Sequence, residues 1–96
     1  MTTNTNKGKK KPKAEELFPE AFVVRDNIML LCRVYGVTDE ELATAIGTSR
    51  ETLRRRKKEP WKYTEYEKKI IANALHTSVS ALYNDMKSLV LSSTGG

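Results

Sequence analysis

Two short stretches that each begin with a helix-capping signal, joined at a single glycine, constrain the fold of this chain more than any other feature. The first begins at Thr38, whose side chain can cap a helix while Glu41 reaches back to the Thr38 amide. It ends at Gly47 after barely two turns, and residues 48–51 (TSRE) then offer a second capping box for a helix that runs to about Lys57. Two short helices joined by a tight glycine-containing turn are typical of an angled helix pair.

The segment before this pair is predicted to be a longer helix. Pro19 suits a first helical turn, the run continues through Tyr35, and Gly36 suits the left-handed position that ends a helix, with Val37 as its hydrophobic partner. Residues 19–24 either join this helix or form a separate turn. The expected apolar face comprises Phe22, Val23, Val24, Ile28, Leu31 and Cys32.

Two more helices are predicted after the pair. Pro60 breaks the chain, and Thr64 with Glu67 forms a third capping box. Apolar residues recur at helical spacing behind it at Tyr66, Ile70, Ala74 and Leu75. Ser78 or Thr77 can cap a last helix that carries Val79, Leu82, Tyr83, Met86, Leu89 and Val90. No β-hairpin signal appears, so we predict an all-α fold, a compact bundle of four to five short helices with a helix-turn-helix.

The 96 residues suit one domain with a modest core. Residues 1–16 are polar and lysine-rich, and we expect a disordered tail there, because such a segment cannot offset the entropy of ordering. Residues 17–91 are predicted to form the helix-turn-helix domain, and residues 92–96 a flexible C-terminal end. The tail is as consistent with a solubilising role as with an arm that contacts DNA.

The positive charge of the domain is concentrated at one place. The net charge is +5, but the first thirteen residues hold five lysines and no acid, so the rest of the chain has twelve basic and twelve acidic residues. A neutral domain that binds polyanions must gather its cations on one face. Six cations fall within nine residues of the second short helix: Arg50, Arg54, Arg55, Arg56, Lys57 and Lys58.

The chain lacks the residue patterns that several classes of function require. One His and one Cys, Cys32 and His76, lie 44 positions apart and do not make a metal site. The paired acids stand in first helical turns, where the helix dipole explains them, and no glycine-rich phosphate loop is present. We therefore expect no enzyme, no cofactor and no small-molecule substrate. No apolar stretch is long enough for a membrane span, no secretory signal is visible, and the lone cysteine suits a reducing cytoplasm.

The stretch GVTDEELATAIGTSRETLRRR resembles the DNA-binding domains of the lambdoid phage repressor and Cro type, also called Xre-type. The positions that match are Leu42, Ala43, Ile46, Gly47, Ser49 and Leu53, and the later segment IANALHTSVSALY is similar to the usual ending of these domains. The likeness covers about 60 of the 96 residues, from about Arg25 to Tyr83. It implies a compact bundle of four or five helices in which the third enters the major groove of double-stranded DNA.

The resemblance also implies which side chains meet DNA. The candidates for base contacts are Arg50, Glu51, Arg54 and Arg55, with Thr52 next in line. Arginine can hold guanine through two hydrogen bonds, and glutamate can accept one from a cytosine amine. The candidates for contacts to the DNA backbone are Thr48, Ser49, Lys57, Lys58 and Lys62. A solvated helix face is the alternative interpretation of the same basic run.

Three residues depart from the pattern of that family. The family usually has an apolar residue where this chain has Arg56, often an acid at the place of Lys57, and frequently a glutamine at that of Asp39. An acid at the last position would repel phosphate unless its charge is taken up by the helix end. We expect Trp61 to close the core in place of Arg56, with base stacking as the alternative for its ring.

The predicted function is a sequence-specific transcriptional regulator, a Cro-like phage or prophage repressor that acts by occupying an operator. The apolar excess at Met86, Leu89 and Val90 suggests the interface of a homodimer. Two other classes remain open: a helix-turn-helix adaptor of a phage packaging or excision complex, and a helical bundle that binds protein. An antitoxin would need a toxin-binding extension, which the short tails do not suggest.

Overall fold

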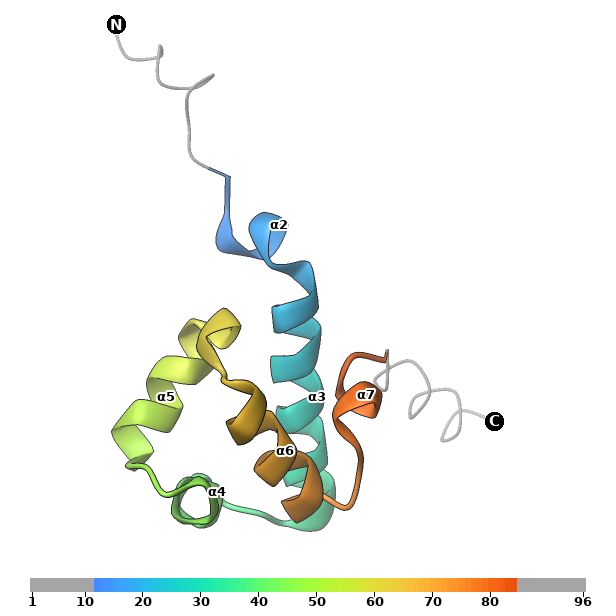
Figure 1. Ribbon diagram of the computed structural model, residues 1–96. Coiled ribbons are helices and arrows are strands. Elements are labelled where there is room, and N and C mark those ends of the chain that lie inside the picture. Colours follow the sequence, from blue (N-terminus) through green and yellow to red (C-terminus); the bar gives the residue numbers. More distant parts are fainter. Residues whose placement is uncertain (1–11, 85–96) are drawn as a thin grey trace, which may run out of the picture.

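The computed structural model describes residues 12–84, and within that range the chain is built from helices without any strand. The elements are α2 (Ala14–Leu17), α3 (Pro19–Tyr35), α4 (Asp39–Ile46), α5 (Arg50–Lys58), the 3-10 helix η1 (Pro60–Lys62), α6 (Glu65–Ala74) and α7 (Val79–Leu82). The predicted all-α bundle is confirmed (Figure 1), and the described residues form six α-helices where the sequence predicts four or five.

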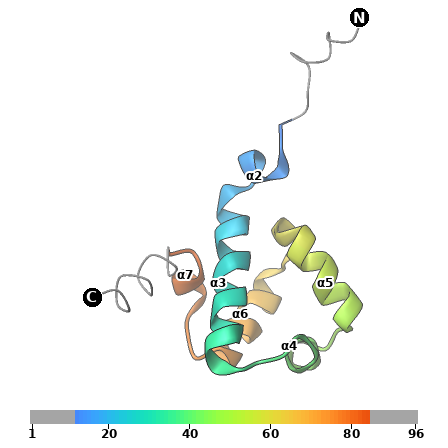
Figure 2. The ribbon, with the colours of Figure 1, turned by 180° about the vertical axis from the view of Figure 1, so that it is seen from behind.

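The long helix α3 runs through the middle of the molecule. Helices α4, α5 and α6 lie on one side of it and α7 on the other, as the views from opposite sides agree (Figures 1 and 2). All of these helices contribute to one core, whose buried apolar members are Val24, Ile28, Leu42, Ala43, Ile46, Leu53, Tyr63, Ile71, Ala72, Leu75 and Leu82. The removal of this apolar surface from water is the main force that holds such short helices together.

Side-chain caps fix most helix starts where the sequence predicts them. Both capping boxes, Thr38 with Glu41 and Thr64 with Glu67, are formed. Ser78 caps α7 by accepting a hydrogen bond from the Ala81 amide at 3.1 Å. Residues 19–24 belong to α3 rather than to a separate turn, because Pro19 occupies the first helical turn, where its missing N–H costs nothing.

The capping box predicted at residues 48–51 is wrong. Ser49 is the N-cap of α5, and its Oγ accepts a hydrogen bond from the Thr52 amide at 3.1 Å. The third helical position is therefore Thr52 rather than Glu51. The carboxylate of Glu51 lies one position too early to reach back to the cap, and it pairs with Arg54 and Arg55 instead.

Left-handed residues end three of the helices. Gly36 and Gly47 have φ angles of 67° and 73°, as the sequence predicts, and they end α3 and α4. His76 takes the equivalent place after α6 with a φ of 58°, a conformation that His tolerates better than most residues other than glycine. Its ring lies edge-on to that of Tyr35, with ring centroids 5.0 Å apart.

Two expectations about the helices need correction. The end of the tail predicted for residues 1–16 is helical, since α2 begins at Ala14. Tyr66 does not face the core and is 68% exposed, since the inward face of α6 is formed by its buried neighbours Lys68, Ile71 and Ala72. Residues 1–11 and 85–96 lie outside the described residues, and with them most of the predicted tail and the predicted continuation of the last helix.

A buried asparagine of α3 holds the last described helix in place. The amide nitrogen of Asn27 donates to the carbonyl of Leu82 at 2.7 Å and also to that of Asn84. Asn27 is 2% exposed and Leu82 is buried, so the Leu82 carbonyl at the end of α7 is satisfied away from water. The link fixes α7 against the side of α3 that lies away from α5 (Figure 1).

Candidate nucleic-acid interface

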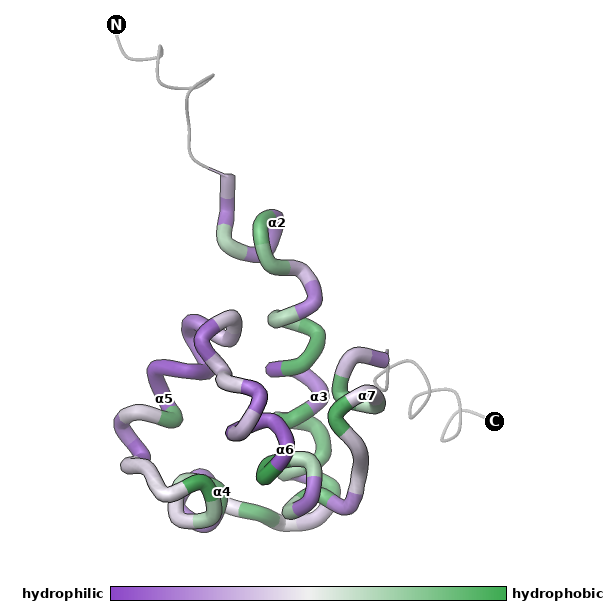
Figure 3. Tube along the Cα trace, viewed as in Figure 1, coloured by the Kyte–Doolittle hydropathy of each residue, from purple (hydrophilic) through white to green (hydrophobic). Residues whose placement is uncertain are grey.

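Helix α5 lies at the outer edge of the bundle, joined to α4 by the turn at Gly47. In Figure 1 α4 is seen along its axis whereas α5 runs across the view, so the two helices form an angled pair. Only one of the nine residues of α5, Leu53, is buried. Nearly the whole of the helix is hydrophilic apart from this one anchor (Figure 3).

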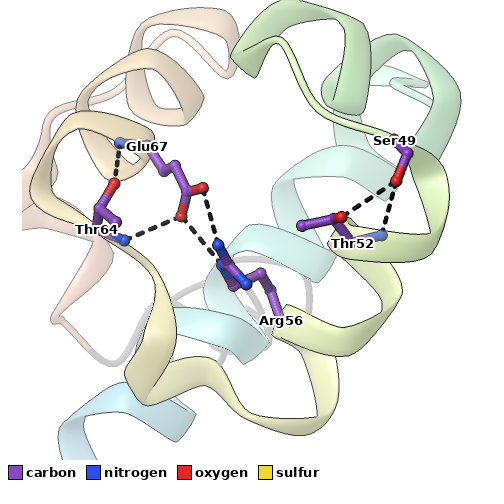
Figure 4. A network of polar contacts seen from close by, with 5 residues as sticks. All are labelled: Ser49, Thr52, Arg56, Thr64 and Glu67. Atoms are coloured by element: carbon purple, nitrogen blue, oxygen red, sulfur yellow. Dashed lines mark hydrogen bonds and ion pairs between the residues drawn. The ribbon is translucent and has the colours of Figure 1, made fainter.

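The beginning of α5 is held by its cap. The Ser49 hydroxyl accepts from the Thr52 amide and donates to the Thr52 hydroxyl, both at 3.1 Å (Figure 4). Thr48 is half-buried, and its amide donates to the carbonyl of Ala43 at 2.9 Å, within the turn. The two residues predicted to contact the DNA backbone at this end therefore also shape the turn and start the helix.

The outward face of α5 brings together all four predicted base-contacting residues. Arg50, Glu51, Arg54, Arg55 and also Lys58 are exposed. A carboxylate oxygen of Glu51 lies 3.5 Å from Arg54 Nη1, and the other lies 3.9 Å from Arg55 Nε. Ion pairs as exposed as these contribute little and can rearrange when a ligand arrives. Four cations and one carboxylate give this face a net charge of +3.

Arg56 points into the bundle instead. Its Nε and Nη2 each lie 3.2 Å from an oxygen of Glu67 on α6, in a two-pronged ion pair (Figure 4). The side chains of Arg56 and Glu67 are only 21% and 13% exposed. Burial alone would raise the pKa of Glu67, but the hydrogen bonds from Arg56 and Thr64 outweigh it and hold that pKa below its ordinary value.

Lys57 also makes an ion pair with a neighbouring helix, in which its own side chain is 28% and that of Asp39 47% exposed. Its Nζ lies 2.8 Å from both carboxylate oxygens of Asp39, at the first residue of α4. The pair neutralises the acid that departs from the pattern of the resembling family. On the other side of the helix end, Arg25 of α3 donates from Nη1 to the carbonyl of Lys57 at 3.1 Å. Nothing in the sequence pointed to Arg25, because its partner is 32 residues away and is a backbone atom.

The residues after α5 occupy two different settings. Lys62 is 54% exposed and lies 3.1 Å from Glu59, so it is accessible beside the end of the helix. The Trp61 ring stacks on Phe18 with centroids 4.8 Å apart and lies 6.0 Å from Phe22. The expectation that Trp61 closes the main core is therefore wrong: its ring is half-buried in a separate aromatic cluster at the start of α3.

The predicted dimer residues Met86, Leu89 and Val90 lie outside the described residues. Between residues 12 and 84 no helix has the length and apolar character that a bilayer span requires. In the same range no three His, Cys, Asp or Glu side chains come together as a metal site would require. Cys32 is half-buried against the core, and burial raises the pKa of its thiol.

The comparisons with known proteins add no relative. No family model, no curated protein and no solved structure matches this chain.

Proposed function

We propose that this protein binds double-stranded DNA through the outward face of α5 and acts as a sequence-specific transcriptional regulator of the lambdoid repressor and Cro type. One observation carries the proposal. The exposed positions of α5 hold four cations, Arg50, Arg54, Arg55 and Lys58, on a capped helix at the edge of an angled helix pair. A helix presented in this way has the dimensions to enter a major groove.

In this proposal the arginines near the start of the helix read bases. Arg50 and Arg55 each donate two hydrogen bonds to a guanine, and Glu51 accepts from a cytosine amine once it leaves its neighbours. The ion pairs of Glu51 with Arg54 and Arg55 are long and exposed, so their exchange for contacts with bases costs little. These side chains supply the sequence preference.

Contacts to phosphates come from the ends of the helix. The amide-rich start at Ser49 and Thr48 favours an anion, because a helix N-terminus carries partial positive charge. Lys58 and Lys62 lie at the other end, both exposed, where a DNA backbone would pass. These contacts supply affinity and its salt dependence.

We further propose that the protein represses by occupying an operator as a symmetric dimer, as a phage or prophage regulator would. Two copies would read half-sites about one turn of DNA apart. Light scattering at micromolar concentration tests the dimer directly. A monomer at that concentration, both free and on a palindromic duplex, would contradict it.

Selection of bound sequences from a random duplex pool tests the proposed function. Wild type should enrich one motif, and Arg50→Ala should relax that motif at a single base pair while weakening binding by about 1–3 kcal/mol. Lys69→Ala is the control, because Lys69 is exposed on α6 rather than on α5, and it should leave the motif unchanged. No enrichment at moderate salt would contradict sequence-specific binding and would favour an adaptor or a protein-binding role.

A further inference from the structure

The basic side chains of α5 point in two directions: one group is exposed to solvent, and the other contacts neighbouring helices. Arg50, Arg54, Arg55 and Lys58 are exposed, whereas the side chains of Arg56 and Lys57 turn back to acids on α6 and α4. Both inward cations come from the C-terminal half of the helix, next to the turn occupied by the buried Leu53. Six cations that look alike in the sequence therefore perform two tasks.

Three polar links connect this half of α5 to three other helices, α3, α4 and α6. Arg56 pairs with Glu67 of α6 at 3.2 Å, Lys57 pairs with Asp39 of α4 at 2.8 Å, and Arg25 of α3 donates to the Lys57 carbonyl at 3.1 Å. We call these three links the α5 clamp. The cation of Arg25 at the carbonyl end of α5 is also the favourable sign for the helix dipole.

The clamp matters because apolar packing alone leaves α5 weakly oriented. Leu53 is the single buried residue of the helix, and one side chain can act as a pivot but cannot fix the direction of an axis. Contacts from three sides at the far end of the helix fix that direction. A helix that is already oriented loses less freedom when it binds than one that must be ordered at that moment.

We propose that Arg25, Arg56 and Lys57 are positioning residues for the proposed DNA interface, and that Asp39 and Glu67 support binding although they carry the same charge sign as DNA. This inference rests on the proposed function. It assigns Lys57 to the clamp in place of the phosphate contact that the sequence suggests. It also explains the acid at position 39, since the Asp39 carboxylate orients α5 through its ion pair with Lys57.

The direction in which one substitution changes DNA affinity distinguishes this proposal from a simple charge effect. If only charge matters, Asp39→Asn removes repulsion and strengthens DNA binding. If the clamp matters, the same change removes the carboxylate charge that holds Lys57 and weakens binding in spite of the more favourable net charge. Glu40→Gln is the matched control, because Glu40 is an exposed acid in the same helical turn and makes no ion pair with the described residues.

We would measure the affinity for an enriched duplex by fluorescence anisotropy in wild type, Asp39→Asn, Asp39→Glu and Glu40→Gln. We expect Asp39→Asn to bind about fivefold to tenfold more weakly than wild type, since a hydrogen-bonded charge pair is lost. Asp39→Glu can re-form the pair and should stay within about twofold of wild type. If Asp39→Asn binds as tightly as Glu40→Gln or more tightly, the proposal is overturned.

A second measurement does not depend on DNA. Amide hydrogen exchange of residues 54–58 should be faster in Asp39→Asn than in Glu40→Gln, while residues 70–74 of α6 should exchange alike in both. If wild type binds no duplex, the proposed function fails but this comparison still decides the clamp. Faster exchange at the end of α5 would support the clamp as the device that orients the helix, and equal exchange would overturn it.

Discussion

Two side chains next to α5, the partly buried Glu67 and the buried Tyr63, satisfy their polar atoms very differently. The Glu67 carboxylate accepts from Arg56 and from the Thr64 amide, whereas the Tyr63 hydroxyl is buried with no hydrogen-bond partner among the described residues. Burial raises the pKa of Tyr63 well above its ordinary value, because removal from water disfavours the charged phenolate. A buried hydroxyl without a partner costs stability compared with an apolar group of the same shape.

Removal of the Tyr63 hydroxyl should therefore leave the protein as stable or make it more stable. For Tyr63→Phe we expect a free energy of unfolding between that of wild type and about 1 kcal/mol above it. Urea denaturation followed by circular dichroism measures this difference. Tyr66→Phe, at a 68% exposed position, should give no change. A loss of more than about 1 kcal/mol in Tyr63→Phe would mean that the hydroxyl has a partner after all.

The lowered pKa of Glu67 predicts how its contribution to stability depends on pH. A carboxyl group whose pKa is lower in the folded state stabilises the protein at pH values above its unfolded pKa. The ordinary value is 4.5, so this contribution is complete at neutral pH and is lost as the pH falls through the lower, folded-state value. Glu67→Gln should therefore be clearly less stable than wild type at about pH 7, and the difference should shrink at about pH 3. A difference that stays constant over this range would contradict the ionic link with Arg56.

At the scale of the elements, the sequence predicts features set by residues a few positions apart, such as helix caps, but not features set by contacts between distant residues. Capping boxes join residues three apart, and the left-handed glycine follows directly on its helix, so spacing alone locates them. The sequence alone places the start of α5 one residue too early, because Thr48 and Ser49 can both cap a helix. Ser49 is the cap in the structure, where Leu53 points into the core. The packing of Leu53 against other helices is not contained in the local sequence.

The candidate interface shows the same division. The outward positions of α5 follow from helical periodicity, and all four residues predicted to contact bases do share that face. The inward pairs could not be predicted, because Arg56 and Lys57 differ from their neighbours only in the partners that other helices bring to them. Arg25 and Asn27 act on backbone carbonyls 32 and 55 residues away, and such contacts leave no trace in spacing or composition.

The turn between α4 and α5 supports a prediction about this helix pair. Gly47 has a φ of 73°, and a Cβ added there would meet no heavy atom within 4 Å. The cost of Gly47→Ala is therefore conformational alone, and we expect a loss of about 1 kcal/mol in the free energy of unfolding. Gly47→Asn should lose less, since asparagine tolerates this backbone conformation. Thermal and urea unfolding measure both, and equal stability of wild type and the alanine variant would contradict the expectation.

At the scale of the whole molecule, acidic and basic side chains are equal in number after residue 13 but unevenly distributed over the surface. Residues 14–96 carry twelve of each, yet the outward face of α5 has a net charge of +3. Two acids next to α5 do not lower the charge of this outward face. Asp39 and Glu67 stand in the first turns of α4 and α6, where they pair with Lys57 and Arg56. An otherwise neutral domain thus acquires a basic edge without an excess of basic residues.

This uneven distribution predicts that two adjacent lysines respond differently to salt. Lys58 is exposed and makes no ion pair with the described residues, so Lys58→Ala should weaken DNA binding and reduce the slope of log affinity against log salt by about 0.9. Lys57→Ala should weaken binding through the loss of orientation and leave that slope nearly unchanged, because the Lys57 ammonium is paired with Asp39 rather than with phosphate. Titrations at several salt concentrations, with Lys69→Ala as the control, measure both slopes. If Lys57→Ala reduces the slope as much as Lys58→Ala does, Lys57 contacts phosphate in the complex and its pair with Asp39 belongs to the free protein only.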